Sequence, residues 1–140
     1  MFSINNKIAF LLDVASTIEY PVRAYRLAAA VIFKKAIVGL GVNGYKSDPF
    51  QLRFRKNPHA IHRHAEIGAI KNALKILKSA DDLRRCTLIV VRVKRNTSNT
   101  FFIPAMAKPC EGCYRCIVEF GIKKVYYTGE DGVLRVTFPI

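Results

Sequence analysis

The chain has 140 residues, of which 51% are apolar, and its formal net charge is +13. This length and apolar content suit one compact domain over residues 1–140 and exclude a disordered chain. No apolar run approaches the roughly 20 residues that a membrane-spanning helix needs, so we expect no membrane span. The positive charge favours anionic partners such as a nucleotide, a nucleic acid or an anionic membrane surface. An ordinary solvated basic surface explains it equally well.

The N-terminal region does not fit a signal peptide, because its apolar run at 8–12 is short and is broken by Asp13. We therefore expect a cytoplasmic protein with reduced thiols. The chain has four cysteines, and in such a compartment cysteines indicate metal binding or catalysis before disulfides.

The first half of the chain begins with a predicted helix over 3–20, where apolar residues recur at helical spacing and Pro21 ends the pattern. Two apolar runs follow at 26–33 and 36–43. The short Lys34-Lys35 link between them predicts an antiparallel hairpin.

Residues 44–63 form a long irregular segment in which cations and aromatic residues alternate. Loops of this length in a compact domain are usually functional, and basic plus aromatic residues suit phosphate and base contacts. An exposed basic loop that buries its phenylalanines is an equally good interpretation. The residues concerned are Lys46, Arg53, Arg55, Lys56 and Arg63, with Tyr45, Phe50 and Phe54.

The second half predicts two helices and further strands. The helices are expected at 64–78 and 110–120, with strands at 86–94, 123–128 and 133–138 and a short extended segment at 101–105. The tight turn at 129–132 joins the last two strands as an antiparallel hairpin. The element order predicts an α/β fold with three layers: a five-stranded mixed sheet with helices on both faces.

Two thiols lie at the predicted start of the helix at 110–120. Cys110 and Cys113 are three residues apart, so both face the same way, and the helix N-terminus lowers thiol pKa. Thiolates bind zinc, and His64 is the candidate third ligand, which would leave one tetrahedral position open as in catalytic sites. Two alternatives are a redox pair and a closed structural zinc site completed by His59 or His62.

Glu66 lies two residues after His64, a spacing that points the side chains about 200° apart on a regular helix. The two can share a site only if His64 precedes regular helical geometry. Glu66 would then shuttle protons between a zinc-activated water and the substrate. The alternative is an acid that merely complements the helix dipole.

Two motifs together resemble the cytidine and deoxycytidylate deaminase superfamily: His64-Ala65-Glu66 and Pro109-Cys110-Glu111-Gly112-Cys113. The resemblance covers about residues 26 to 128. It implies a cytidine-deaminase-like fold, one zinc ion per chain on His64, Cys110 and Cys113, and Glu66 as the general acid/base. It also implies substrate contacts by Asn43, Ala65 and Tyr127.

Histidine as the first ligand resembles deoxycytidylate and polynucleotide deaminases, so we predict conversion of dCMP to dUMP, with Arg53 and Arg55 holding the phosphate. One alternative is a base in RNA or single-stranded DNA, which the net charge favours. Another is free cytidine or deoxycytidine, because the terminal hairpin resembles that of free cytidine deaminases. A zinc-stabilised binding module would require an idle Glu66. The resemblance further implies a homo-oligomer.

Overall fold

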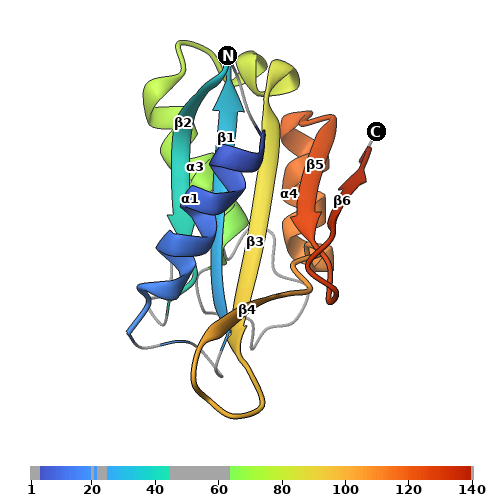
Figure 1. Cartoon of the computed structure of the whole chain (residues 1–140). Helices are drawn as coiled ribbons and strands as arrows, with labels where there is room; N and C mark the ends of the chain where they lie inside the picture. The colour runs from blue at the N-terminus through green and yellow to red at the C-terminus, as the bar shows by residue number, and fades with distance from the viewer. Residues whose placement is uncertain (1–3, 20, 22–24, 45–63, 140) are drawn as a thin grey trace.

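The computed structural model describes residues 4–19, 21, 25–44 and 64–139, and Figure 1 shows their arrangement. The basic segment at 45–63, with Arg53 and Arg55, lies outside the described residues. In chain order the elements are α1 (Ile4–Ser16), β1 (Arg26–Phe33), β2 (Ala36–Val42), α3 (Ala65–Ile76), the 3₁₀ helix η1 (Ala80–Arg85), β3 (Thr87–Arg95), β4 (Phe102–Ala105), α4 (Glu111–Phe120), β5 (Lys124–Thr128) and β6 (Leu134–Thr137).

The strands form one mixed sheet with the order β2-β1-β3-β5-β6, and β4 pairs with β3 beside this path. β3 and β5 are parallel, whereas the other pairs, including the terminal hairpin of β5 and β6, are antiparallel. The mixed sheet and the hairpin were therefore predicted correctly. The sheet has six strands and not five. β5 pairs only with 87–90 of β3, so β4 fills the edge that β3 leaves open at 92–95.

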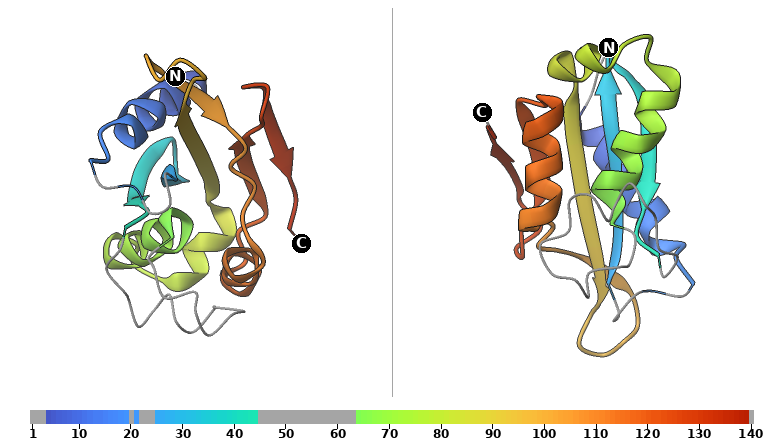
Figure 2. Two further views of the ribbon diagram at one scale, coloured as in Figure 1. Left: turned by 90° about the horizontal axis from the view of Figure 1, so that it is seen from below. Right: turned by 180° about the vertical axis from the view of Figure 1, so that it is seen from behind.

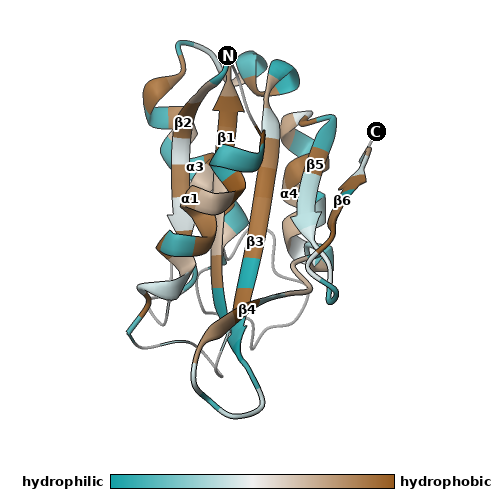
Figure 3. Ribbon diagram, viewed as in Figure 1, coloured by the Kyte–Doolittle hydropathy of each residue, from teal (hydrophilic) through white to brown (hydrophobic). Residues whose placement is uncertain are grey.

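Helices cover both faces of the sheet, as predicted (Figures 1 and 2). On one face α1 packs on the central strands through Leu11 and Ala15. On the other face α3, η1 and α4 bury a larger core that includes Ile70, Leu83 and Ile117. β1 and β3 contribute alternate residues to the two cores, which is why Figure 3 shows both strands as hydrophobic over most of their length.

Close contact between α3 and β2 fixes the height of α3 on the sheet. A methyl group on Gly41 would overlap the carbonyl oxygen of Ala65, and one on Gly39 would overlap that of Ala69. Only glycine permits this approach, because any larger residue would push the helix away. The start of α3 is therefore held directly over Gly41.

Two segments differ from the sequence-based expectation. α1 ends at Ser16, earlier than the predicted residue 20, and the Ser16 hydroxyl donates to the carbonyl of Leu12. The residues after α3 form η1, which the sequence analysis took only as a helix end. The Ser79 hydroxyl caps η1 by accepting from the Asp81 N–H. None of the described helices has the length and apolar content to cross a membrane.

Candidate zinc and catalytic site

The candidate site lies where the N-termini of α3 and α4 meet, at one end of the sheet (Figure 2, right). His64 is the N-cap residue of α3 and has extended backbone angles, φ −98° and ψ 146°. Cys110 is the N-cap residue of α4 and is extended as well, with φ −70° and ψ 170°. Because His64 precedes the first helical turn, it can serve the same site as Glu66, the condition that the sequence analysis set.

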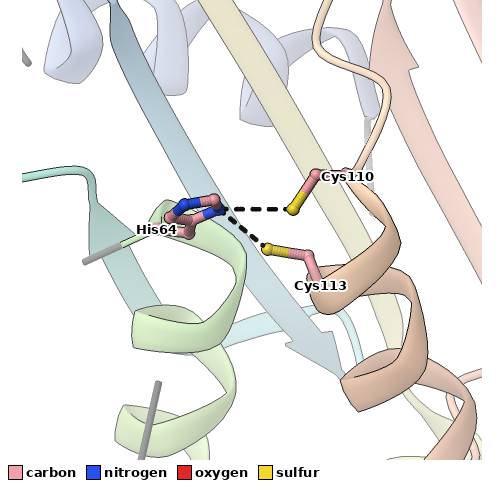
Figure 4. A group of neighbouring side chains, drawn as sticks. All are labelled: His64, Cys110 and Cys113. Carbon is pink, nitrogen blue, oxygen red and sulfur yellow. Dashed lines mark hydrogen bonds between the residues drawn. The ribbon is translucent and has the colours of Figure 1, made fainter. Parts of the chain in front are cut away.

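Three potential ligand atoms come together there, from His64, Cys110 and Cys113, and all lie within 4.8 Å of one another. His64 Nδ1 is 3.4 Å from the Cys110 Sγ and 3.3 Å from the Cys113 Sγ (Figure 4). One imidazole nitrogen and two thiol sulfurs are the donor types that zinc prefers, and three protein ligands are typical of catalytic zinc sites. The residues therefore fit one zinc ion.

The three ligands hold their protons unequally when no metal is bound. A hydrogen bond from Cys113 lowers the pKa of the Cys110 thiol to about 4, against the effect of its burial. The hydrogen bond with Cys110 raises the pKa of His64, and the same pairing together with burial raises that of Cys113. One thiolate is thus already present at neutral pH. Zinc would displace the proton of Cys113, because a thiolate is the form that binds the metal.

Glu66 is buried beside these ligands, with only 3% of its surface exposed. It is the second residue of α3. Burial raises the pKa of its carboxyl group, the backbone N–H of Glu66 itself opposes the rise, and the negative charge of Cys110 adds to it. A carboxyl group that titrates above its usual range is suited to accept a proton and to give it back.

Ala65, Tyr127 and Asn43, the other predicted site residues within the described part of the chain, lie on the same face of the sheet but differ in their contacts. Ala65 is buried as the first residue of α3, and Tyr127 on β5 belongs to the core under α3 and α4. Asn43, just after β2, uses its side chain to hold β1. Its Oδ1 accepts from the Leu27 N–H at 2.9 Å and its Nδ2 donates to the Tyr25 carbonyl at 2.8 Å.

Sequence reasoning missed Thr128, which fastens the segment before Cys110 to the sheet. Its buried hydroxyl donates to the Ala105 carbonyl at 2.7 Å and accepts from the Arg92 N–H at 3.2 Å. The Thr128 carbonyl accepts from the Ala107 N–H at 2.8 Å. A polar residue at the end of an apolar strand was the only signal, and it is a weak one.

The remaining cysteines lie outside the ligand group. Cys86 and Cys116 are both buried in the core under α3 and α4. The Cys86 thiol contacts the carbonyl oxygen of Asp82 at 3.3 Å. Among the described residues, no other group of three histidine, cysteine or acidic side chains lies close enough together to hold a metal ion.

The sequence profile described as the cytidine and deoxycytidylate deaminase zinc-binding region matches residues 6–129. The chain belongs to this family. The matched zinc-binding region contains His64, Cys110 and Cys113, the group that lies close enough together to bind one zinc ion. A search of curated protein sequences found no match.

Solved deaminases share the fold of this family member. The cytidine deaminase of Burkholderia pseudomallei is similar with a TM-score of 0.67 and 18% identity, over 98% of this chain and 93% of that one. The dCMP deaminase of the cyanophage S-TIM5, in apo form, is similar with a TM-score of 0.57 and 24% identity, over 94% of this chain and 89% of that one. The same enzyme in complex with dCMP and dUMP has a TM-score of 0.56 and 23% identity, over 93% of this chain and 85% of that one.

Proposed function

We propose that the protein is a zinc-dependent hydrolytic deaminase of a cytosine nucleotide that converts dCMP to dUMP, with Glu66 as the proton shuttle. One observation carries the proposal: a buried carboxyl group with a raised pKa lies beside a three-residue zinc site. A binding module would gain nothing from this arrangement, since burying an acid next to a thiolate is unfavourable.

His64, Cys110 and Cys113 would hold the zinc ion, which would supply Lewis acidity and lower the pKa of a water molecule. Glu66 would accept the first proton of the water that adds to C4 of cytosine, and it would pass that proton to N3. Glu66 then accepts the second proton of the water and gives it to the amino group, which leaves as ammonia. The result is uracil plus ammonia, with Glu66 restored to its starting state.

The substrate class is supported by the family, which is described by both cytidine and deoxycytidylate, and by the dCMP and dUMP bound to the cyanophage enzyme. Binding of the phosphate by Arg53 and Arg55, and of the nucleoside by Asn43, Ala65 and Tyr127, stays a prediction. So do the cytoplasmic location and the homo-oligomeric state.

Free cytidine or deoxycytidine is the second candidate substrate. The observation that favours it is the antiparallel pairing of β6 with β5. This hairpin is the feature in which the sequence resembles free cytidine deaminases.

The test offers the zinc-loaded protein dCMP, CMP, deoxycytidine and cytidine, and follows loss of the amino group by mass spectrometry. We expect turnover of dCMP. Glu66→Gln should reduce it by about 10²- to 10⁴-fold, as for loss of a general acid/base, with unchanged zinc content. Glu119→Gln on the exposed face of α4 is the matched control and should stay active. Full activity of Glu66→Gln would refute the shuttle, and turnover of nucleosides alone would refute the nucleotide substrate.

A further inference from the structure

Arg92 interrupts the apolar run of β3 and lies on the face of the sheet that carries α3 and α4. It pairs with Leu27 of β1 and with Ala105 of β4. Residues opposite each other in antiparallel strands point to the same face. Leu27 packs against the core under α3 and α4, so Arg92 points to that face too.

The register also places Arg92 at the end of the sheet that holds the zinc site. Gly41 lies under the first residue of α3, and Asn43, just after the end of β2, is the next residue that points to that face. Asn43 is hydrogen-bonded to Leu27, which pairs with Arg92. These three residues form a row across the sheet, and two strand spacings separate Asn43 from Arg92 by about 10 Å. That span is close to the length of a nucleoside monophosphate.

The guanidinium group of Arg92 is held in place but has an unused donor. Its Cζ lies 4.2 Å from the centre of the Tyr25 ring, and Tyr25 is 42% exposed. The Nε atom is buried and has no hydrogen-bond partner among the described residues. A buried donor on a charged group that lacks an acceptor is costly, so an anion that approaches the terminal nitrogens of the guanidinium group would offset this cost.

Glu130, an acidic residue whose pKa the charge of Arg92 affects, has other hydrogen-bond partners. Glu130 accepts from Lys94 Nζ at 3.2 Å and from the Met106 N–H at 3.3 Å. The hydrogen bond from Lys94 lowers the pKa of Glu130 most, and the charge of Arg92 is the weakest of the named causes. Glu130 therefore leaves the guanidinium group available.

We propose that Arg92, stacked on Tyr25, binds a phosphate group of the substrate and determines specificity for phosphorylated cytosine. The proposal rests on the deaminase function proposed above. Arginine presents planar paired donors that match two phosphate oxygens, and the ring fixes their direction. The same contact fits the 5′-phosphate of a monophosphate and a phosphate of a single-stranded polynucleotide.

The first experiment compares kcat/KM for dCMP, deoxycytidine and a single-stranded oligodeoxynucleotide with one cytosine. Arg92→Gln should lower the value for at least one phosphorylated substrate by about ten- to a hundredfold, the range for hydrogen bonds to charged groups. The value for deoxycytidine should stay within about twofold. The phosphorylated substrate whose kcat/KM falls identifies the source of the phosphate. The proposal would be overturned if kcat/KM fell equally for deoxycytidine, or if it fell for neither phosphorylated substrate.

The matched control is Arg95→Gln, because it removes the same charge from the same strand. Arg95 stacks on Phe102 with its Cζ 4.1 Å from the ring centre, and Phe102 packs against the core on the opposite face of the sheet. Kinetics should therefore be unchanged in this variant. Arg92→Lys keeps the charge and the apolar stem, so it protects folding and should show a smaller loss than Arg92→Gln.

The second experiment separates this proposal from the proposed function, since it needs no turnover. Calorimetry measures the binding of inorganic phosphate and of dUMP to the zinc-loaded wild type, Arg92→Gln and Arg95→Gln. We expect the wild type and Arg95→Gln to bind, with affinity at least tenfold weaker in Arg92→Gln. Equal affinity in all three proteins, or no binding to the wild type, would refute the phosphate site even if dCMP is deaminated. A loss of affinity in Arg92→Gln alone would support the phosphate site even if no deamination is found.

Discussion

Cys110 and Cys86 carry the same thiol group, and their surroundings shift its pKa in opposite directions. Hydrogen bonds from Cys113 and His64 stabilise the Cys110 thiolate and lower the pKa to about 4. Burial raises the pKa of Cys86 to about 11, and the charge of Asp82 adds to the rise. Only Cys110 lies at the start of a predicted helix with a second thiol three residues later.

This contrast predicts selective alkylation of the metal-free protein. Iodoacetamide should modify Cys110 at a rate that is nearly constant from about pH 5 to pH 8, because the thiolate predominates above its lowered pKa. The rate should fall as the pH approaches about 4. Cys86 should stay unmodified throughout, since its pKa is raised and its side chain is buried.

Peptide mass spectrometry after timed quenching checks both rates, and loading with zinc provides the control because it should protect Cys110. A Cys110 rate that rises steeply between about pH 8 and pH 9, as for an ordinary thiol, would contradict the lowered pKa. Modification of Cys86 at a similar rate would contradict its burial.

The geometry around Glu66 shows where residue-level prediction reached its limit. The sequence stated the condition for a shared site, and the extended backbone of His64 meets it. It did not predict that the side chain of Asn43 is bonded to the backbone of β1. Nor did it single out Arg92, because the face to which a strand residue points depends on register.

At the scale of elements, the position of α3 depends on the glycines of β2. α3 carries Glu66 and begins directly after His64, and Gly41 allows its first turn to touch the strand. The position of the site thus depends on a glycine, a residue without a side chain, on the neighbouring strand. The physical role of these glycines emerged only from the contact with α3.

Gly41→Ala should destabilise the protein and disturb the zinc site together. The new methyl group would overlap the backbone of Ala65 and Ala69, and overpacking of this kind costs about 1–3 kcal/mol. Each kcal/mol corresponds to about 2–4 °C in unfolding temperature for a chain of this size. Thermal unfolding should show a lower unfolding temperature than in the wild type, and zinc titration should show a weaker zinc affinity.

Gly44→Ala is the matched control, because no atom of the described residues lies within 4 Å of a methyl group at that position. Its unfolding temperature and zinc affinity should stay close to the wild type, or the protein should gain slightly from the stiffer unfolded chain. Equal stability of the two variants would show that α3 does not depend on Gly41.

Element order was largely predictable, including the short extended segment that became β4, whereas the pairing of β4 and the helix η1 were not. Long apolar periodic runs identified α3, β3 and α4, and the tight turn identified the β5–β6 hairpin. β4 has only four residues, and its pairing depends on the edge that β3 leaves open. η1 depends on a single hydroxyl cap. Such features follow from tertiary context more than from local pattern.

At the scale of the whole molecule, the zinc ligands connect two helices that belong to distant parts of the chain. His64 precedes α3 and Cys110 precedes α4, and both helices share one face of the sheet. A metal ion bound by both segments cross-links them in the folded state. The unfolded chain does not hold these ligands together, so binding energy becomes folding energy.

Removal of zinc should therefore lower the unfolding temperature of the entire protein in one transition. At a zinc concentration about a thousand times its dissociation constant, the stabilisation is about 4 kcal/mol, which corresponds to on the order of 10 °C. Scanning calorimetry with and without a chelator measures the difference.

Cys113→Ser should abolish this difference in unfolding temperature, because a ligand is lost. Cys116→Ala removes a buried thiol of α4 that is not a ligand, so this variant should keep the full difference even if its own unfolding temperature is lower. A chelator effect that persists in Cys113→Ser, or disappears in Cys116→Ala, would place the stabilising metal outside the His64, Cys110 and Cys113 group.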